Sequence, residues 1–293
     1  PRMPAGQRPL FSQYVRFYRG MCRYRMGMEA DSQRARKEEL KQAREEFTKL
    51  LATVPDTAFY FEAKLTDAKC LEAFSPSQAA DRYGFLLKDF SEKIQKAGID
   101  WAEKYKFPAI MGGIRLKMED LVSRRGNDDK VKALLGELRR LLEGGLYRKF
   151  GDTSTDAEAT KIEATALTYL KQYKELIDIL DTQIRSSQMN DDAASLGALY
   201  LRRGGCYYRL AKEEEAAAKQ KELQERALMD NLRADLVFAL PRAEKAQANL
   251  RVAELFAQLR SKDWKTRAKK HLKEAKANGA EPTEVREVED LLE

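Results

Sequence analysis

Apolar residues recur every three or four positions along most of the chain, with charged residues between them. This spacing puts the apolar side chains on one face of an α-helix, so the pattern predicts a series of amphipathic helices. In one segment an apolar stripe runs from a candidate N-cap at Asp128 or Asp129 to a stop at Gly144–Gly145. The stripe consists of Val131, Leu134, Leu135, Leu138, Leu141 and Leu142.

The chain also contains an internal repeat. Residues 16–28 (RFYRGMCRYRMGM) and 200–212 (YLRRGGCYYRLAK) align without gaps and share five identities in thirteen positions. The same shift of 184 positions carries Ala43 onto Ala227 and Phe47 onto Asn231. We therefore expect one structural unit used twice. The identical pairs are Arg19/Arg203, Gly20/Gly204, Cys22/Cys206, Tyr24/Tyr208 and Arg25/Arg209.

These segments follow a known helical-repeat pattern. Phe17-x2-Gly20-Met21-x2-Tyr24 fits a first helix, and Ala43-x3-Phe47 with Pro55 eight residues later fits a second helix and its closing proline. The chain therefore resembles the tetratricopeptide repeat family. The resemblance implies stacked two-helix units whose chemistry is contact with other molecules. The carboxylate-clamp activity of some family members is not carried over, because Cys22 and Cys206 stand where the clamp has Asn.

About six helix pairs can be read along the chain; 248–279 is another strong match to the pattern, and the remaining units are more degenerate. The segments 29–42 and 211–232 exceed the family length, and they are charged, helix-prone and free of Gly and Pro. We predict an all-α fold, an α-solenoid of tetratricopeptide-like helical hairpins with two elongated helical arms. Segment 94–108, with Gly98 and Trp101, interrupts the rhythm as either a hinge or a long loop. The further units are 59–90, 109–142, 157–187 and 248–279, and Pro282 opens a short capping helix.

The predicted organisation has four parts, written here by residue range. They are N-terminal repeats with an elongated arm (1–97), a divergent helical pair with a connecting loop (98–150), C-terminal repeats with the second arm (151–281), and the capping helix (282–293).

Composition changes this picture in three ways. Charged residues make up 34% of the chain and no apolar run approaches about 18 residues, so we expect a soluble protein. The net charge of +7 favours acidic partners, which are RNA, an anionic membrane face or acidic protein surfaces. The first 28 residues hold six arginines and no acid, which resembles a mitochondrial targeting region.

A reducing compartment is expected, with the cytoplasm and the mitochondrial matrix both open. The start at Pro1 suggests further residues upstream.

Catalytic and cofactor chemistry finds no support in the sequence. There is no phosphate-binding glycine loop, no GxSxG and no metal-binding motif, so we expect no enzyme, no cofactor, no metal and no small-molecule substrate. The single histidine, His271, is interpreted as a surface residue. The cysteines Cys22, Cys70 and Cys206 are interpreted as small buried apolar residues.

Two basic segments are candidate contact surfaces. In the first, an aromatic face made of Phe11, Tyr14, Phe17 or Tyr18, Met21 and Tyr24 suits burial and leaves the arginines in solvent. Stacking of nucleic-acid bases and protein contact are the alternatives. The second segment is the lysine cluster near 262–273, either a solvated face or a site for RNA or an acidic protein. The predicted partner-binding set is Arg16, Arg19, Arg23, Arg202, Arg203, Lys262, Lys265, Lys269 and Lys270.

The expected function is a non-enzymatic scaffold or adaptor that serves as a structural subunit of a larger assembly with protein partners. The alternative is an RNA-contacting subunit of a ribonucleoprotein, such as an organellar ribosome. Binding of RNA would weaken strongly with salt, because it rests on contacts between basic side chains and phosphates.

Overall fold

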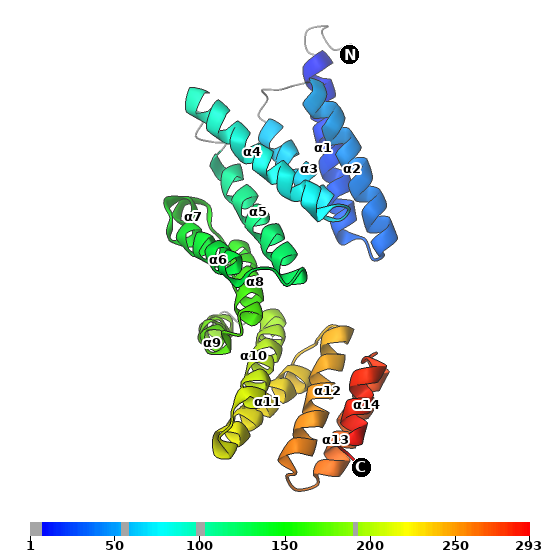
Figure 1. The fold of residues 1–293 in the computed structure, drawn as a ribbon. Helices are drawn as coiled ribbons and strands as arrows, with labels where there is room; N and C mark the ends of the chain where they lie inside the picture. Colours follow the sequence, from blue (N-terminus) through cyan, green and yellow to red (C-terminus); the bar gives the residue numbers. More distant parts are fainter. Residues whose placement is uncertain (1–7, 54–58, 98–102, 190–192) are drawn as a thin grey trace. The chain divides into compact units, whose positions relative to one another are not determined.

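The computed structural model describes the backbone of residues 8–53, 59–97, 103–189 and 193–293. Over these ranges the chain forms fourteen helices and no strand, which confirms the predicted all-α fold of helical hairpins (Figure 1). The helices are α1 (Arg8–Glu29), α2 (Gln33–Thr53), α3 (Tyr60–Glu72), α4 (Pro76–Ala97), α5 (Glu103–Ser123), α6 (Asp128–Glu143), α7 (Gly145–Phe150), α8 (Thr153–Tyr169), α9 (Tyr173–Met189), α10 (Ala193–Glu213), α11 (Ala217–Val237), α12 (Arg242–Leu259), α13 (Trp264–Ala277) and α14 (Pro282–Asp290).

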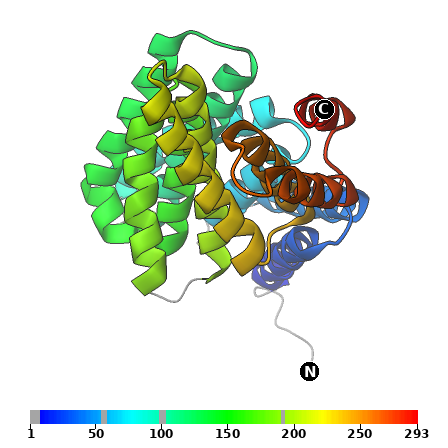
Figure 2. The ribbon, with the colours of Figure 1, turned by 90° about the horizontal axis from the view of Figure 1, so that it is seen from below.

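The chain divides into two units, residues 1–166 and 167–293. Within each unit, most helices that follow one another in sequence pack side by side, among them α1 with α2, α3 with α4, α10 with α11 and α12 with α13, as a stack of hairpins requires. Figures 1 and 2 show this for α1 with α2 and for α10 with α11. The division into four parts remains a prediction. The predicted closing residue Pro55 and the segment with Gly98 and Trp101 lie outside the described residues.

The internal repeat is visible in the structure. The shift of 184 positions carries α2 onto α11 from first residue to last, and it carries the end of α1 onto the end of α10. These four helices have 21 or 22 residues each, as do α4 and α5, compared with 13 in α3. Gly20 and Gly204 have similar surroundings, as expected of one structural unit used twice, because each lies close to the same repeat position of the following helix. A Cβ added to Gly20 would lie 2.6 Å from Phe47, and one added to Gly204 would lie 2.5 Å from Asn231.

Large side chains opposite small ones explain this packing. In the first hairpin Phe47 fills the space that Gly20 leaves, and a cluster with Phe17, Leu40 and Leu50 closes around it. The next hairpin of the unit is held by Phe61, which stacks on Phe90 with ring centroids 4.6 Å apart. The cores therefore follow the apolar stripes that the sequence predicts.

The helices begin and end at the expected residues, with one correction at the N-terminus of α6. The residue that caps α6 is Asn127, whose side chain accepts a hydrogen bond from the Asp129 backbone N–H, and not Asp128 or Asp129. The amide side chain accepts this hydrogen bond from just outside the helix, so the two carboxylates belong to its first turn. Gly144 ends α6 as expected, and Pro282 opens α14.

His271 on α13 is buried, which corrects its interpretation as a surface residue. Its Nδ1 lies 2.7 Å from Oδ1 of Asn249 on α12, and Nδ2 of Asn249 donates to Asp235 on α11 at 2.6 Å. The histidine is therefore part of a polar network that joins three helices of the second unit. Burial is tolerated because Asn249 gives Nδ1 of the imidazole a hydrogen-bond partner.

The second unit should lose stability in mild acid. Burial lowers the pKa of His271 below its usual value of about 6.5, although Asp235 and Glu274 oppose this shift; Lys270 adds to it. Below about pH 6.5 the unfolded chain gains a proton at His271 before the folded chain does, so stability falls as the pH falls. We expect urea unfolding to show this loss between about pH 7.5 and about pH 5.5. His271→Asn should show a smaller pH dependence, and an unchanged pH dependence would contradict the assignment.

Candidate functional site

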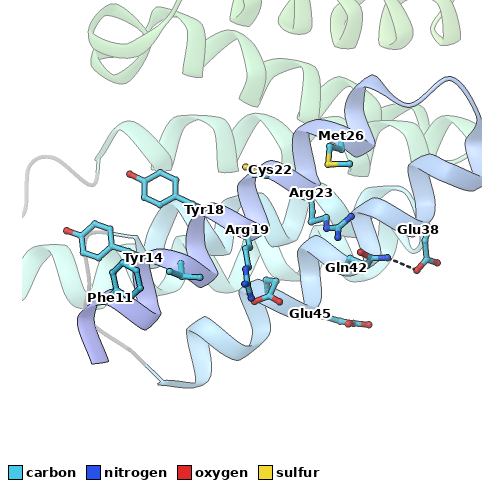
Figure 3. A pocket seen from close by; sticks show the side chains of 12 residues that line it. Phe11, Tyr14, Tyr18, Arg19, Cys22, Arg23, Met26, Glu38, Gln42 and Glu45 are labelled. Carbon is cyan, nitrogen blue, oxygen red and sulfur yellow. Dashed lines mark hydrogen bonds between the residues drawn. The ribbon is translucent and has the colours of Figure 1, made fainter. Parts of the chain in front are cut away.

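An open groove runs along the first hairpin, and the described residues that line it come from α1 and α2 (Figure 3). Its volume is about 1100 Å³. The α1 side chains Phe11, Tyr14, Val15, Tyr18, Arg19, Cys22, Arg23 and Met26 line it together with Glu38, Gln42, Glu45 and Glu46 from α2. We call this feature the α1–α2 groove.

The α1–α2 groove exposes large apolar side chains. Phe11 is 55% exposed, Tyr14 41%, Tyr18 56% and Met26 51%. Each is an ordinary surface residue alone, but together along one helix they form a surface of the kind that marks interaction sites. This arrangement corrects the expectation that the aromatic face is buried as a whole.

Only part of the predicted aromatic face turns inward. Phe17 is buried and stacks on Phe59 with ring centroids 4.4 Å apart, while Met21 and Tyr24 are half-buried against the same core. The rings of Tyr14 and Phe59 pack edge to face with their centroids 4.8 Å apart, but Tyr14 remains 41% exposed. The physical reason is that the core residues of α2 and α3 cover only one side of α1.

The three arginines predicted on α1 have different surroundings. Nη1 of Arg23 donates to both carboxylate oxygens of Glu39 on α2, at 2.9 and 3.1 Å. Arg16 is half-buried, whereas Arg19 is exposed and forms no ion pair within the described part of the chain. Of these three arginines, Arg19 is therefore the one with the most freedom to bind an outside carboxylate.

The opposite lip of the groove is acidic. Glu38, Gln42 and Glu45 follow one another at helical spacing along α2, and Nε2 of Gln42 donates to Glu38 at 3.1 Å. The groove thus has arginines along α1, glutamates along α2 and aromatic rings at one end (Figure 3). Our sequence reasoning missed the acidic lip, although the i, i+4, i+7 spacing of these polar residues could have revealed it.

In the hairpin of α10 and α11, Arg203 occupies the repeat position of Arg19 and binds carboxylates of its own chain. Nε and Nη2 of Arg203 donate to Asp230 on α11 at 2.7 and 2.8 Å, and Nη1 bonds to Asp181 on α9. The hydrogen bond to Asp230 raises the pKa of the guanidinium, so Arg203 stays charged. Arg202 beside it is exposed. Contact between these two arginines and a partner remains a prediction.

The lysine cluster lies at the surface of the second unit. Lys265, Lys269 and Lys270 are exposed on α13, and Lys262 is exposed in the turn before it. That turn separates Lys262 from the lysines of α13, because Asp263 adopts a left-handed conformation with φ 59° at the start of the helix. Partner binding by this cluster also remains a prediction.

The cysteines are not equivalent, although two of them occupy the same repeat position. Cys70 and Cys206 are buried as expected, but Cys22 is exposed in the α1–α2 groove, which corrects that expectation. Burial raises the pKa of Cys70 to about 12 and of Cys206 to about 11. Both thiols are therefore neutral at physiological pH and poor nucleophiles.

Among the described residues, no group of three or more His, Cys, Asp or Glu side chains is placed to hold a metal ion. None of the helices in the described ranges has the length and apolar character needed to cross a bilayer.

The fold defines the class of protein as an all-α protein built from helical hairpins. Comparison with protein-family models and with curated proteins gives no match. Among solved structures, a tetratricopeptide repeat protein from Parabacteroides merdae ATCC 43184 is similar over 87% of this chain and 93% of that chain. The TM-score is 0.43 and the sequence identity is 14%, so this similarity assigns neither family nor function.

Proposed function

We propose that this protein is a non-enzymatic scaffold or adaptor of tetratricopeptide-like hairpins that binds another protein in the α1–α2 groove. One observation carries the proposal. Phe11, Tyr14, Tyr18 and Met26 leave a large apolar surface exposed along a single groove, with charged groups on both lips. Aromatic and Met side chains beside arginine are the composition that protein interfaces favour at their centres.

The proposed role within a larger assembly follows from this contact with a partner. A chain that holds a partner in such a groove serves as a structural subunit of an assembly. The free thiols at Cys22, Cys70 and Cys206 support a reducing compartment, the cytoplasm or the mitochondrial matrix.

Site-specific photo-crosslinking tests the proposal. A photo-reactive amino acid at Tyr18 lies in the groove, and one at Phe85 on α4 provides a matched control that is 62% exposed outside the groove. We expect one protein to be captured from native extract at Tyr18 and not at Phe85. With that protein purified, Phe11→Ala or Tyr18→Ala should weaken binding by about tenfold or more, because buried aromatic anchors dominate interfaces. Equal capture at both positions would contradict the proposal.

The alternative function is RNA contact through α13, as in a ribonucleoprotein such as an organellar ribosome. The exposed Lys265, Lys269 and Lys270 favour it, because they present three positive charges on one short helix. Filter binding with unrelated RNAs over a salt series separates the two functions. Micromolar binding that weakens steeply with salt supports the alternative, and no binding at low salt removes it.

A further inference from the structure

A small hollow in the second unit is lined by three arginines. Its volume is about 280 Å³, and most of the described residues that line it belong to α10 and α12. Arg202 and Arg209 come from α10, and Arg251 comes from α12. The two arginines of α10 are seven positions apart, so they lie on the same face of that helix. We call this feature the arginine hollow.

The charges in the arginine hollow are not neutralised by the described part of the chain. None of the three arginines forms an ion pair with a described carboxylate. The neighbouring Arg203, by contrast, pairs with both Asp181 and Asp230. The guanidinium of Arg209 lies 5.7 Å from the ring centroid of Tyr173, a contact that leaves its charge in place. The hollow therefore offers three positive charges to a ligand.

The fold makes room for one of these arginines. Arg251 is half-buried, and a Cβ added to Gly205 on α10 would lie 2.8 Å from its Nη1. The missing side chain of this glycine is therefore what lets the guanidinium lie against α10. Burial lowers the pKa of Arg251 below its usual value, and the positive charge of Arg209 adds to this shift. An anion beside the guanidinium would offset both effects.

The three guanidiniums lie around one buried thiol. Burial raises the pKa of Cys206 to about 11, and all three arginines act against this rise. Charges that act on the same thiol lie close to one another. Glu244 is the one acidic side chain among the described residues that line the hollow, and it pairs with none of the arginines. Three arginines and one glutamate give this lining a formal charge of +2.

We propose that the arginine hollow binds a phosphate group, either as the free ion or as part of a small phosphate ester. Arg202, Arg209 and Arg251 donate hydrogen bonds to the phosphate oxygens. This ligand site lies in the second unit and goes beyond the proposed function, which rests on the α1–α2 groove of the first unit.

Charge, geometry and size all favour phosphate. A phosphate monoester carries about −1.5 to −2 charges at pH 7 and three acceptor oxygens, which match the charge of the lining and its three guanidiniums. A guanidinium can bind phosphate through two parallel hydrogen bonds. A carboxylate carries a single negative charge and would leave part of the positive charge unmatched. The hollow is also smaller than the pockets of about 300–1,000 Å³ that hold drug-sized molecules, so a small ligand fits it.

Isothermal titration calorimetry of the full chain with inorganic phosphate tests the inference. We expect saturable binding that Arg251→Gln weakens by about tenfold or more, because hydrogen bonds between charged groups are strong. Gly205→Ala keeps all three arginines but should also weaken binding, because its Cβ displaces the Arg251 guanidinium. Glu244→Gln should tighten binding, because it removes the negative charge from the lining.

The matched control is Arg286→Gln. This variant removes the same charge at an exposed position on α14 in the same unit, outside the lining of the hollow, and it should leave binding unchanged. Circular dichroism of each variant shows whether the helices are retained, and acetate at the same ionic strength should bind more weakly than phosphate. Three results would overturn the inference: no saturable phosphate binding, equal weakening by Arg251→Gln and Arg286→Gln, or equal binding of acetate and phosphate.

A second titration, with O-phosphoserine, identifies the source of the phosphate. Tighter binding than that of inorganic phosphate supports a small ester as the ligand, and weaker binding supports the free ion. Failure of phosphate binding is distinct from failure of the proposed function, because photo-crosslinking at Tyr18 tests the α1–α2 groove alone.

Discussion

Replacing Arg203 by Met is expected to lower the free energy of unfolding of the second unit by about 3–5 kcal/mol. The Asp230 side chain is only 3% exposed, and Arg203 holds it with hydrogen bonds of 2.7 and 2.8 Å. Removing the guanidinium leaves a carboxylate buried without a counter-ion, and Asp181 loses its partner as well. The cost arises from the charge that stays behind more than from the contact that is lost.

Hydrogen exchange of the amides in α10 and α11, combined with urea unfolding, measures this change. Arg19→Met is the matched control, because Arg19 occupies the same repeat position but is exposed and forms no ion pair among the described residues. Its effect should stay within about 0.5 kcal/mol. Adding Asp230→Leu to Arg203→Met should recover part of the loss, because no buried carboxylate then remains unpaired at that position. Equal losses at Arg19 and Arg203 would refute the assignment.

Phe47→Ala is expected to destabilise the first unit by about 3–5 kcal/mol. The side chain is 0% exposed and lies at the centre of the cluster that joins α1, α2 and α3. Its loss removes apolar contacts and leaves a cavity beside Gly20, which has no side chain to fill it.

Urea unfolding and exchange at the α2 amides report this effect. Phe85→Ala, at an exposed phenylalanine on α4, should change stability by less than about 0.5 kcal/mol. A double-mutant cycle adds a sharper readout. Gly20→Ala alone pushes a Cβ to 2.6 Å from the Phe47 ring and should be destabilising, but it should cost much less in the Phe47→Ala background. Additive effects would show that the two residues do not pack as described.

The evidence for the helical pattern and for the repeat register is local, and for that reason the sequence could predict both. The short helix α7 was not predicted, because Gly144–Gly145 was interpreted only as a stop. A helix stripe such as that of α6 depends on spacing within one segment, and its cap at Asn127 lies within two residues of the expected position. The equivalence of Gly20 and Gly204 could also be predicted from the sequence. Each glycine leaves room for the side chain that the following helix places opposite it. The candidate groove could be predicted only in part, since the pattern of α1 indicates its arginines but not which aromatics stay exposed.

The sequence by itself thus determined the helices, the repeat and the register in which the two long hairpins correspond, because these depend on neighbours close along the chain. Only the tertiary structure decided which faces are covered. Cys22 and Cys206 share a repeat position, yet one is exposed and the other buried. Arg19 and Arg203 also share one, yet only Arg203 meets carboxylates, which lie 22 and 27 residues away. Burial and charge pairing depend on which distant helix lies across a face, and no spacing within the face itself specifies that.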